Sequence, residues 1–322
     1  MDEPESTMTS LLSEVVSGVP APVKVSFFKA FSDLLGGVAA VPAAKLRQYA
    51  QAIDDTTSAR SMAADALAKT SVDKALKDPE MIMAASEIYL PTTLRKVKNR
   101  MRVAQIAAEN LVKDSANADG GGSEAPDDDW MNSFMRFAED ASSERLQDVF
   151  GRILAGQVLR PGAFGLATLR TVSELNQEIA DDFTHAWAKN AGDAVDLSSG
   201  WQLGDGFMRW KRLSEAGLMA SSSSARFSPL FHQEPNDNEI PLWSPILMDD
   251  MWLNVHLCDG AESQWNHIDF TRVGRELGSI LPKPDYAANI RLVAHNLPRH
   301  GVKKIEFLRD GQPTEVIWQF LP

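Results

Sequence analysis

Residues 127–169 constrain the fold of this chain more than any other segment. Three aspartates open the segment, aromatic residues follow at helical spacing, and a second apolar repeat follows a pair of serines. Carboxylates suit the positive end of a helix dipole, and Asp and Ser are preferred N-cap residues. The pattern therefore predicts two consecutive helices. Asp128 or Asp129 is expected to cap the first helix, and Ser142 or Ser143 the second.

The large apolar residues of these two helices are expected to form one buried group, which we call the signature cluster. Its members are Trp130, Phe134, Phe137, Leu146, Phe150, Ile153 and Leu154. Their spacing places each set on one helix face, and a short break lets the second helix fold back on the first. We interpret the segment as a structural core that preserves a fold, and the sequence indicates no active site within it.

Composition is that of a soluble globular protein with more than one domain. The chain has 322 residues, of which 44% are hydrophobic and 24% charged. Its one cysteine, Cys258, excludes an internal disulfide and fits a reducing compartment. The N-terminus lacks the basic and apolar regions of a signal peptide, and no apolar run reaches the length of a membrane span. The expected location is the cytoplasm.

The fold class expected is mainly α with a C-terminal α+β part. A stretch rich in glycine, small polar residues and acids separates two helical regions and is typical of a linker. The predicted organisation is an N-terminal helical region over 1–114, a flexible linker over 115–129, a helical bundle over 130–197 and an α+β region over 198–322. Helices are also predicted over 43–69 and 92–113, and a C-terminal β-hairpin around Asp310-Gly311.

The order of motifs in the C-terminal region is that of a winged-helix module. A helix ends at Gly217-Leu218, strands follow at 254–258 and 265–270, and a Thr-x-x-Gly-x-x-Leu motif begins at Thr271. Gly217 is expected to end its helix in a left-handed turn, and Thr271 to cap the closing helix. The strands between them would form the wing. Winged helices contact either proteins or DNA, and the acids of this region favour protein contact.

One basic patch stands against the overall net charge of −12, which disfavours broad binding to nucleic acid. The predicted helix 92–113 carries Arg95, Lys96, Lys98, Arg100 and Arg102, mostly opposite its apolar stripe. Two interpretations stay open at this point. The patch is either a solvated helix face or a binding site for an anionic partner.

Motifs for catalysis, cofactors and metals give no convergent set. His256 and Cys258 share a strand face but lack a third orienting group, so nucleophilic catalysis is disfavoured. No pair of the six histidines has a zinc-ligand spacing, and no phosphate-binding glycine loop is present. We therefore expect no catalytic, cofactor-binding or metal-binding residues, and no cofactor.

Part of the segment that starts at Trp130 resembles a known family. The stretches Ala138–Glu144, Gly151–Gly156 and Pro161–Leu169 resemble the bacterial domain of unknown function 2806, with Phe150 where we expect Trp in many relatives. The pattern is also similar, more weakly, to abortive-infection proteins of the alpha type. The resemblance implies a bacterial or phage-related setting and a role in phage defence, and it supplies no catalytic residue.

Three functions follow as hypotheses. The first is a cytoplasmic, non-enzymatic interaction or regulatory protein whose partner is another protein or a second copy of the chain. The second is a regulator that binds nucleic acid through the winged-helix-like region and the basic patch. The third is an abortive-infection effector that meets a membrane surface through the amphipathic stretch 23–46. Packing of that stretch on later helices is the alternative, and insertion across a membrane is not expected.

Overall fold

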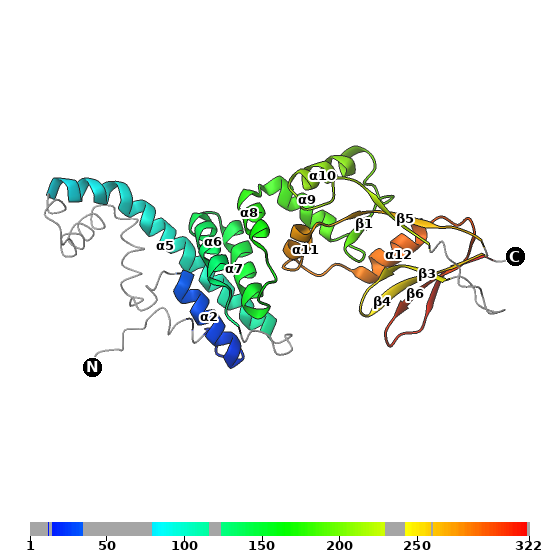
Figure 1. The fold of residues 1–322 in the computed structure, drawn as a ribbon, viewed down its shortest axis with the longest axis horizontal. Coiled ribbons are helices and arrows are strands. Elements are labelled where there is room, and N and C mark those ends of the chain that lie inside the picture. The colour runs from blue at the N-terminus through cyan, green and yellow to red at the C-terminus, as the bar shows by residue number, and fades with distance from the viewer. Residues whose placement is uncertain are drawn as a thin grey trace. The chain divides into compact units, whose positions relative to one another are not determined.

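A computed structural model describes residues 12, 15–34, 79–115, 124–228, 242–258 and 260–320. The predicted helix 43–69 and part of the predicted linker, residues 116–123, lie outside the described residues. The chain divides into two compact units, Met1–Ser173 and Glu174–Pro322. Helices form the described part of the first unit, and strands join helices in the second (Figure 1). The predicted fold class, mainly α with a C-terminal α+β part, is confirmed.

The helices of the first unit are α2 (Ala21–Leu34), α5 (Pro79–Ser115), α6 (Asp128–Asp140), α7 (Glu144–Leu159) and α8 (Leu166–Glu174), which ends at the division. Helix α5 packs along α7 and α6, and α2 packs on all three. Phe27, Phe31 and Leu34 of α2 are fully buried, so its apolar face is part of the protein core. Within the described ranges, no helix is long and apolar enough to cross a membrane.

The ends of α6 and α7 confirm one predicted cap and correct another. The carboxylate of Asp127 accepts hydrogen bonds from the backbone N–H groups of Asp129 and Trp130, at 3.0 and 3.1 Å. The prediction of Asp128 or Asp129 as the cap is therefore wrong, since both lie in the first turn. Their charges still suit the helix dipole there. Ser143 caps α7 as expected, accepting from Leu146 N at 3.3 Å.

The observed units differ from the predicted domains. Helix α5 shares one core with α6 and α7, so residues 79–115 belong with the bundle that follows the predicted linker. The other boundary, placed at residue 197, moves to Ser173 because strand β1 (Ala194–Asp196) pairs with β5 (Gln264–Asp269). Helix packing and strand pairing between residues distant in the sequence decide both boundaries. Local composition indicates neither of them.

A three-stranded antiparallel sheet organises the first half of the second unit. Its strand order is β1-β5-β2, with β2 at Ser224–Phe227. The accompanying helices are α9 (Gln177–Trp187), α10 (Gly204–Glu215) and α11 (Arg272–Gly278). The predicted helices near these positions are therefore present.

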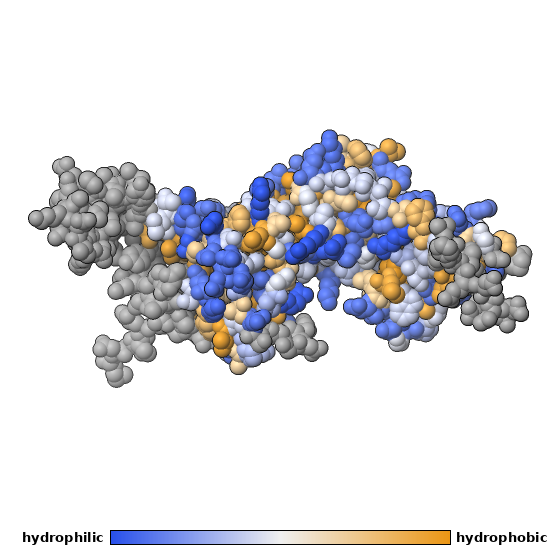
Figure 2. Space-filling view, viewed as in Figure 1, coloured by the Kyte–Doolittle hydropathy of each residue, from blue (hydrophilic) through white to orange (hydrophobic). Residues whose placement is uncertain are grey.

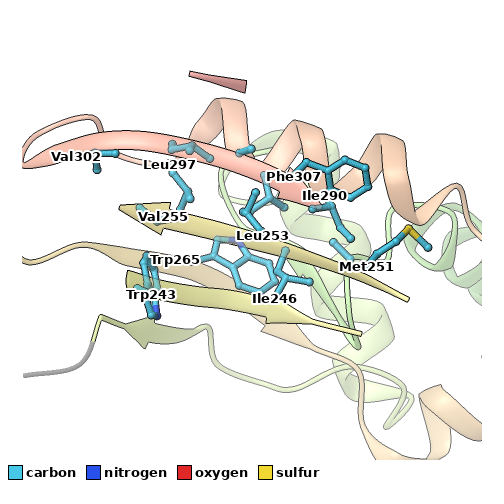
Figure 3. Close-up of a cluster of buried hydrophobic side chains, with 14 of the residues drawn as sticks. Trp243, Ile246, Met251, Leu253, Val255, Trp265, Ile290, Leu297, Val302 and Phe307 are labelled. Carbon is cyan, nitrogen blue, oxygen red and sulfur yellow. The ribbon is translucent and has the colours of Figure 1, made fainter. Parts of the chain in front are cut away.

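A second antiparallel sheet has the order β3-β4-β6-β7, formed by β3 (Leu242–Leu247), β4 (Met251–Leu257), β6 (Val302–Arg309) and β7 (Glu315–Gln319). Helix α12 (Tyr286–Asn296) packs against it. Figure 3 shows Leu253, Ile290 and Phe307 among the side chains of the shared apolar core. The predicted C-terminal hairpin is confirmed by the β6–β7 pair. The two strands predicted to form one wing lie in different sheets, β4 here and β5 in the first, which corrects that expectation.

The two glycine motifs of the second unit meet at one junction. Gly217 adopts a left-handed backbone with φ of 73°, as predicted for a helix end. The Thr271 hydroxyl donates to Gly217 O at 2.6 Å and accepts from Gly274 N at 3.0 Å, so Thr271 caps α11. Thr271 N also donates to Leu218 O at 3.1 Å. The end of α10 and the start of α11 are therefore joined through a single residue.

Candidate interaction surface

The signature cluster is largely a buried core. Trp130 stacks on Phe134 with 4.9 Å between ring centroids, and Phe134 meets Phe150 edge-on at 5.7 Å. These three rings are buried together with Ile153 and Leu154. Phe137 and Leu146 are only half-buried, so their predicted burial is wrong. The buried stripe of α6 runs instead through Met131, Phe134 and Ala138, a small rotation of the helix about its axis.

Polar contacts explain why the signature continues beyond the cluster. Trp130 Nε1 donates to the carbonyl oxygen of Phe164 at 2.7 Å, and Phe164 N donates to Gln157 Oε1 at 3.1 Å. The ring of Phe164 packs so closely on Gly156 that an added Cβ there would overlap it. The turn that carries Phe164 is thus held by two helices, and the signature residues stabilise structure.

The basic patch splits into two parts. Lys96 Nζ lies 2.6 Å from Glu139 Oε1, and Arg100 forms an ion pair with the same carboxylate. Burial lowers the pKa of Arg100, and the charge of Asp140 opposes that shift. The other three residues, Arg95, Lys98 and Arg102, are exposed. Their spacing of three and four places them on one outer face of α5.

His256 has a carboxylate partner on the neighbouring strand β6, a group that the sequence did not reveal. His256 Nε2 lies 2.6 Å from Glu306 Oε2, and Lys304 Nζ lies 2.8 Å from the other oxygen of the same carboxylate. Burial raises the pKa of Glu306, but the hydrogen bonds from Lys304 and His256 outweigh burial and lower it overall. Among the described residues, no group of three His, Cys, Asp or Glu side chains could hold a metal ion.

Several arginines of residues 198–281 are held by partners within the unit, whereas Arg272 is largely exposed beside Glu276 of its own helix. Arg209 and Arg212 of α10 both pair with the buried carboxylate of Asp182 on α9, at 3.1 and 2.6 Å. The hydrogen bond to Asp182 raises the pKa of Arg212. Beyond α10, Arg226 donates to Pro245 O and stacks on Trp265, and Arg275 donates to Phe270 O. These cations stabilise contacts inside the unit.

The outward side of α10 carries large apolar side chains beside charged ones. Leu213 is the single buried residue of this helix. Leu203, Phe207 and Met208 are 84%, 43% and 48% exposed. Figure 2 shows hydrophobic surface, in orange, where α10 lies. We call these three residues, with the exposed Lys211, the α10 surface.

Sequence reasoning missed the α10 surface, although a signal was available. The apolar residues Phe207, Met208 and Leu213 do not fall on one stripe of an ideal helix. Because they lie on different sides, a helix that packs through Leu213 leaves Phe207 and Met208 exposed. Apolar residues on both sides of a short, polar-flanked helix therefore indicate a second contact surface.

The described parts define a mainly helical protein of two units with an exposed apolar helix surface in the second. Residues 92–232 match the model of a family described as a protein of unknown function (DUF2806). The resemblance to this family is thereby confirmed, over a segment that runs from α5 past β2. The weaker likeness to abortive-infection proteins is not shown. No curated protein and no solved structure matches the chain.

Proposed function

We propose that this protein is a non-enzymatic interaction or regulatory protein that binds another protein through the α10 surface. One observation carries the proposal: the arginines of α10 are paired with Asp182, while Phe207 and Met208 are exposed. Contiguous exposed apolar residues with a polar rim are typical of protein–protein contact sites. Aromatic and methionine side chains are enriched in such interfaces.

Binding of DNA by this region has less support. Affinity for nucleic acid depends on cations that are free to neutralise phosphates. Arg209, Arg212 and Arg226 are held by partners within the unit, and the net charge of the chain is −12. The antiparallel β2–β5 pair and the Gly217–Thr271 junction support a winged-helix-like module. Its surface chemistry favours a protein partner.

A capture experiment tests the proposal. The immobilised protein captures a partner from a cell lysate. The double change Phe207→Ser with Met208→Ser should weaken binding of that partner at least about tenfold, a loss of about 1.4 kcal/mol. The control is Leu247→Ser, which changes a large apolar residue that is 75% exposed on β3. Affinity is measured with both purified proteins by calorimetry, and each variant is checked by its melting curve. Equal affinity of the double variant and the parent would exclude the α10 surface as the contact site.

A second candidate function rests on the exposed face of α5. Arg95, Lys98 and Arg102 present three positive charges on one side of a helix, which suits phosphate groups. On this candidate, gel shifts with duplex DNA show affinity that falls steeply as salt rises. Replacing all three by Glu should flatten the salt slope by about 0.9 for each phosphate that is no longer neutralised. The control, Lys113→Glu, changes an exposed cation in the last turn of α5. No shift of DNA at low salt would remove this candidate.

The suggestion of a role in phage defence rests on the resemblance to abortive-infection proteins of the alpha type, which the comparisons do not show. The experiment that tests this role compares phage plating on cells with and without the intact gene. The double variant Phe207→Ser with Met208→Ser serves as the separation-of-function control. Protection lost with that variant would link defence to the α10 surface, and protection unaffected by deletion would exclude the role.

A further inference from the structure

We propose that the partner bound by the α10 surface is a second copy of this chain. In the proposed dimer the two α10 helices lie antiparallel about a two-fold axis at Met208. This inference rests on the proposed function and names its partner. The exposed Asp205 and Lys211 of α10 are complementary to those of the same helix turned end to end.

Two opposite charges flank Met208 at equal distances along the helix. Asp205 precedes it by three residues and Lys211 follows it by three, and all three side chains are exposed. Residues three apart share one helix side. When two such helices cross antiparallel at Met208, Asp205 of each copy faces Lys211 of the other. One surface thus supplies both halves of two symmetric ion pairs, as an isologous two-fold interface requires.

The ends of α10 are complementary in the same arrangement. The helix begins at Gly204 after Leu203, which as N-cap makes no side-chain hydrogen bond, so the first N–H groups lack a side-chain cap. Glu215 lies in the last turn with 67% of its side chain exposed. An antiparallel pair brings this carboxylate toward the uncapped N-terminus of the other copy. A negative charge at that end is favourable because of the helix dipole.

The apolar residues fit a close helix pair. Gly204 and Met208, four residues apart on one side of the helix, form the seam of the proposed helix pair. Gly204 has open space where a Cβ would stand, so a facing helix can approach there. Phe207 lies beside this seam and would be covered with Met208. Lys211 has only a 4.0 Å contact with Glu215 inside its own copy, which leaves it available to a partner carboxylate.

Charge exchange in the full chain tests the dimer. Mass is measured by sedimentation equilibrium and light scattering. The parent should be a dimer, and Asp205→Lys and Lys211→Asp should each weaken dimerisation at least about tenfold, because each places like charges opposite one another. Mixing the two single variants should restore a dimer with one copy of each, since both ion pairs then form. The variant that carries both Asp205→Lys and Lys211→Asp should also dimerise with itself. High salt should reduce all of these differences.

Defined outcomes overturn the proposal. A monomeric parent excludes the self-pairing of α10, and so does a dimer that survives both single variants. Failure of the mixed variants to form a heterodimer excludes the antiparallel register. The parent could be a monomer that binds a different protein, with that binding lost in the variant Phe207→Ser with Met208→Ser. The proposed function then stands, and the proposal that the partner is a second copy is wrong. If neither set of variants changes any association, both proposals are wrong. Melting curves of Asp205→Lys and Lys211→Asp confirm that both variants fold.

Discussion

Replacing Phe150 by alanine is expected to lower the free energy of unfolding of the first unit by about 3–5 kcal/mol. The Phe150 ring is 1% exposed and meets Phe134 edge-on, so its removal leaves a cavity beside a stacked aromatic pair. Small domains are held by only about 5–15 kcal/mol, so the melting temperature and the soluble yield should both fall sharply. Urea unfolding followed by tryptophan fluorescence gives the measurement.

Phe137→Ala is the matched control in the neighbouring helix. Phe137 is half-buried, so the same chemical change should cost about 1 kcal/mol. Equal destabilisation by the two variants would contradict the burial that separates them. A Phe150→Ala protein that melts like the parent but loses partner binding would show that the aromatic residues form a recognition surface.

Local signals in the sequence were sufficient for most of the helices of the first unit. The Ser143 cap and the burial of Trp130, Phe134 and Phe150 follow from residue type and spacing alone. Spacing identifies a helix face but not its width, because the width is set by the helices packed against it. Phe137 lies at the margin of that face and stays half-exposed for this reason.

Charged pairs distant in the sequence were beyond local reasoning. Lys96 and Glu139 lie 43 residues apart, and their ion pair depends on how α5 crosses α6. The basic patch therefore looked uniform in the sequence, although Lys96 and Arg100 are neutralised within the fold. The ion pairs of Arg209 and Arg212 could not be predicted either, because their partner Asp182 lies on another helix.

Sheet membership was the hardest property to predict. Strands β4 and β5 are separated by only a few residues, yet β4 pairs with β3 and β6 while β5 pairs with β1 and β2. An alternating apolar pattern predicts a strand and its buried face, but it carries no information on which distant strand completes the ladder. The α10 surface was missed for a related reason, because exposure depends on which neighbours cover a helix.

Gly274→Ala should strongly destabilise the second unit. A Cβ at this position would overlap the backbone oxygen of Leu218. That oxygen accepts the hydrogen bond from Thr271 N at 3.1 Å, so it cannot move away without loss of the junction between α10 and α11. Overpacking of this kind costs about 1–3 kcal/mol, and loss of the Thr271 cap adds about 1 kcal/mol.

The control for this prediction is Gly217→Ala at the other side of the junction. Gly217 has φ of 73° with open space around a Cβ, so alanine there meets only the backbone penalty of about 1–2 kcal/mol. Thermal unfolding should therefore rank the parent above Gly217→Ala and Gly217→Ala above Gly274→Ala. A Gly274→Ala protein as stable as the parent would mean that α11 can shift away from Leu218. The close approach to Leu218 would then not explain why the Thr-x-x-Gly-x-x-Leu motif has a glycine at this position.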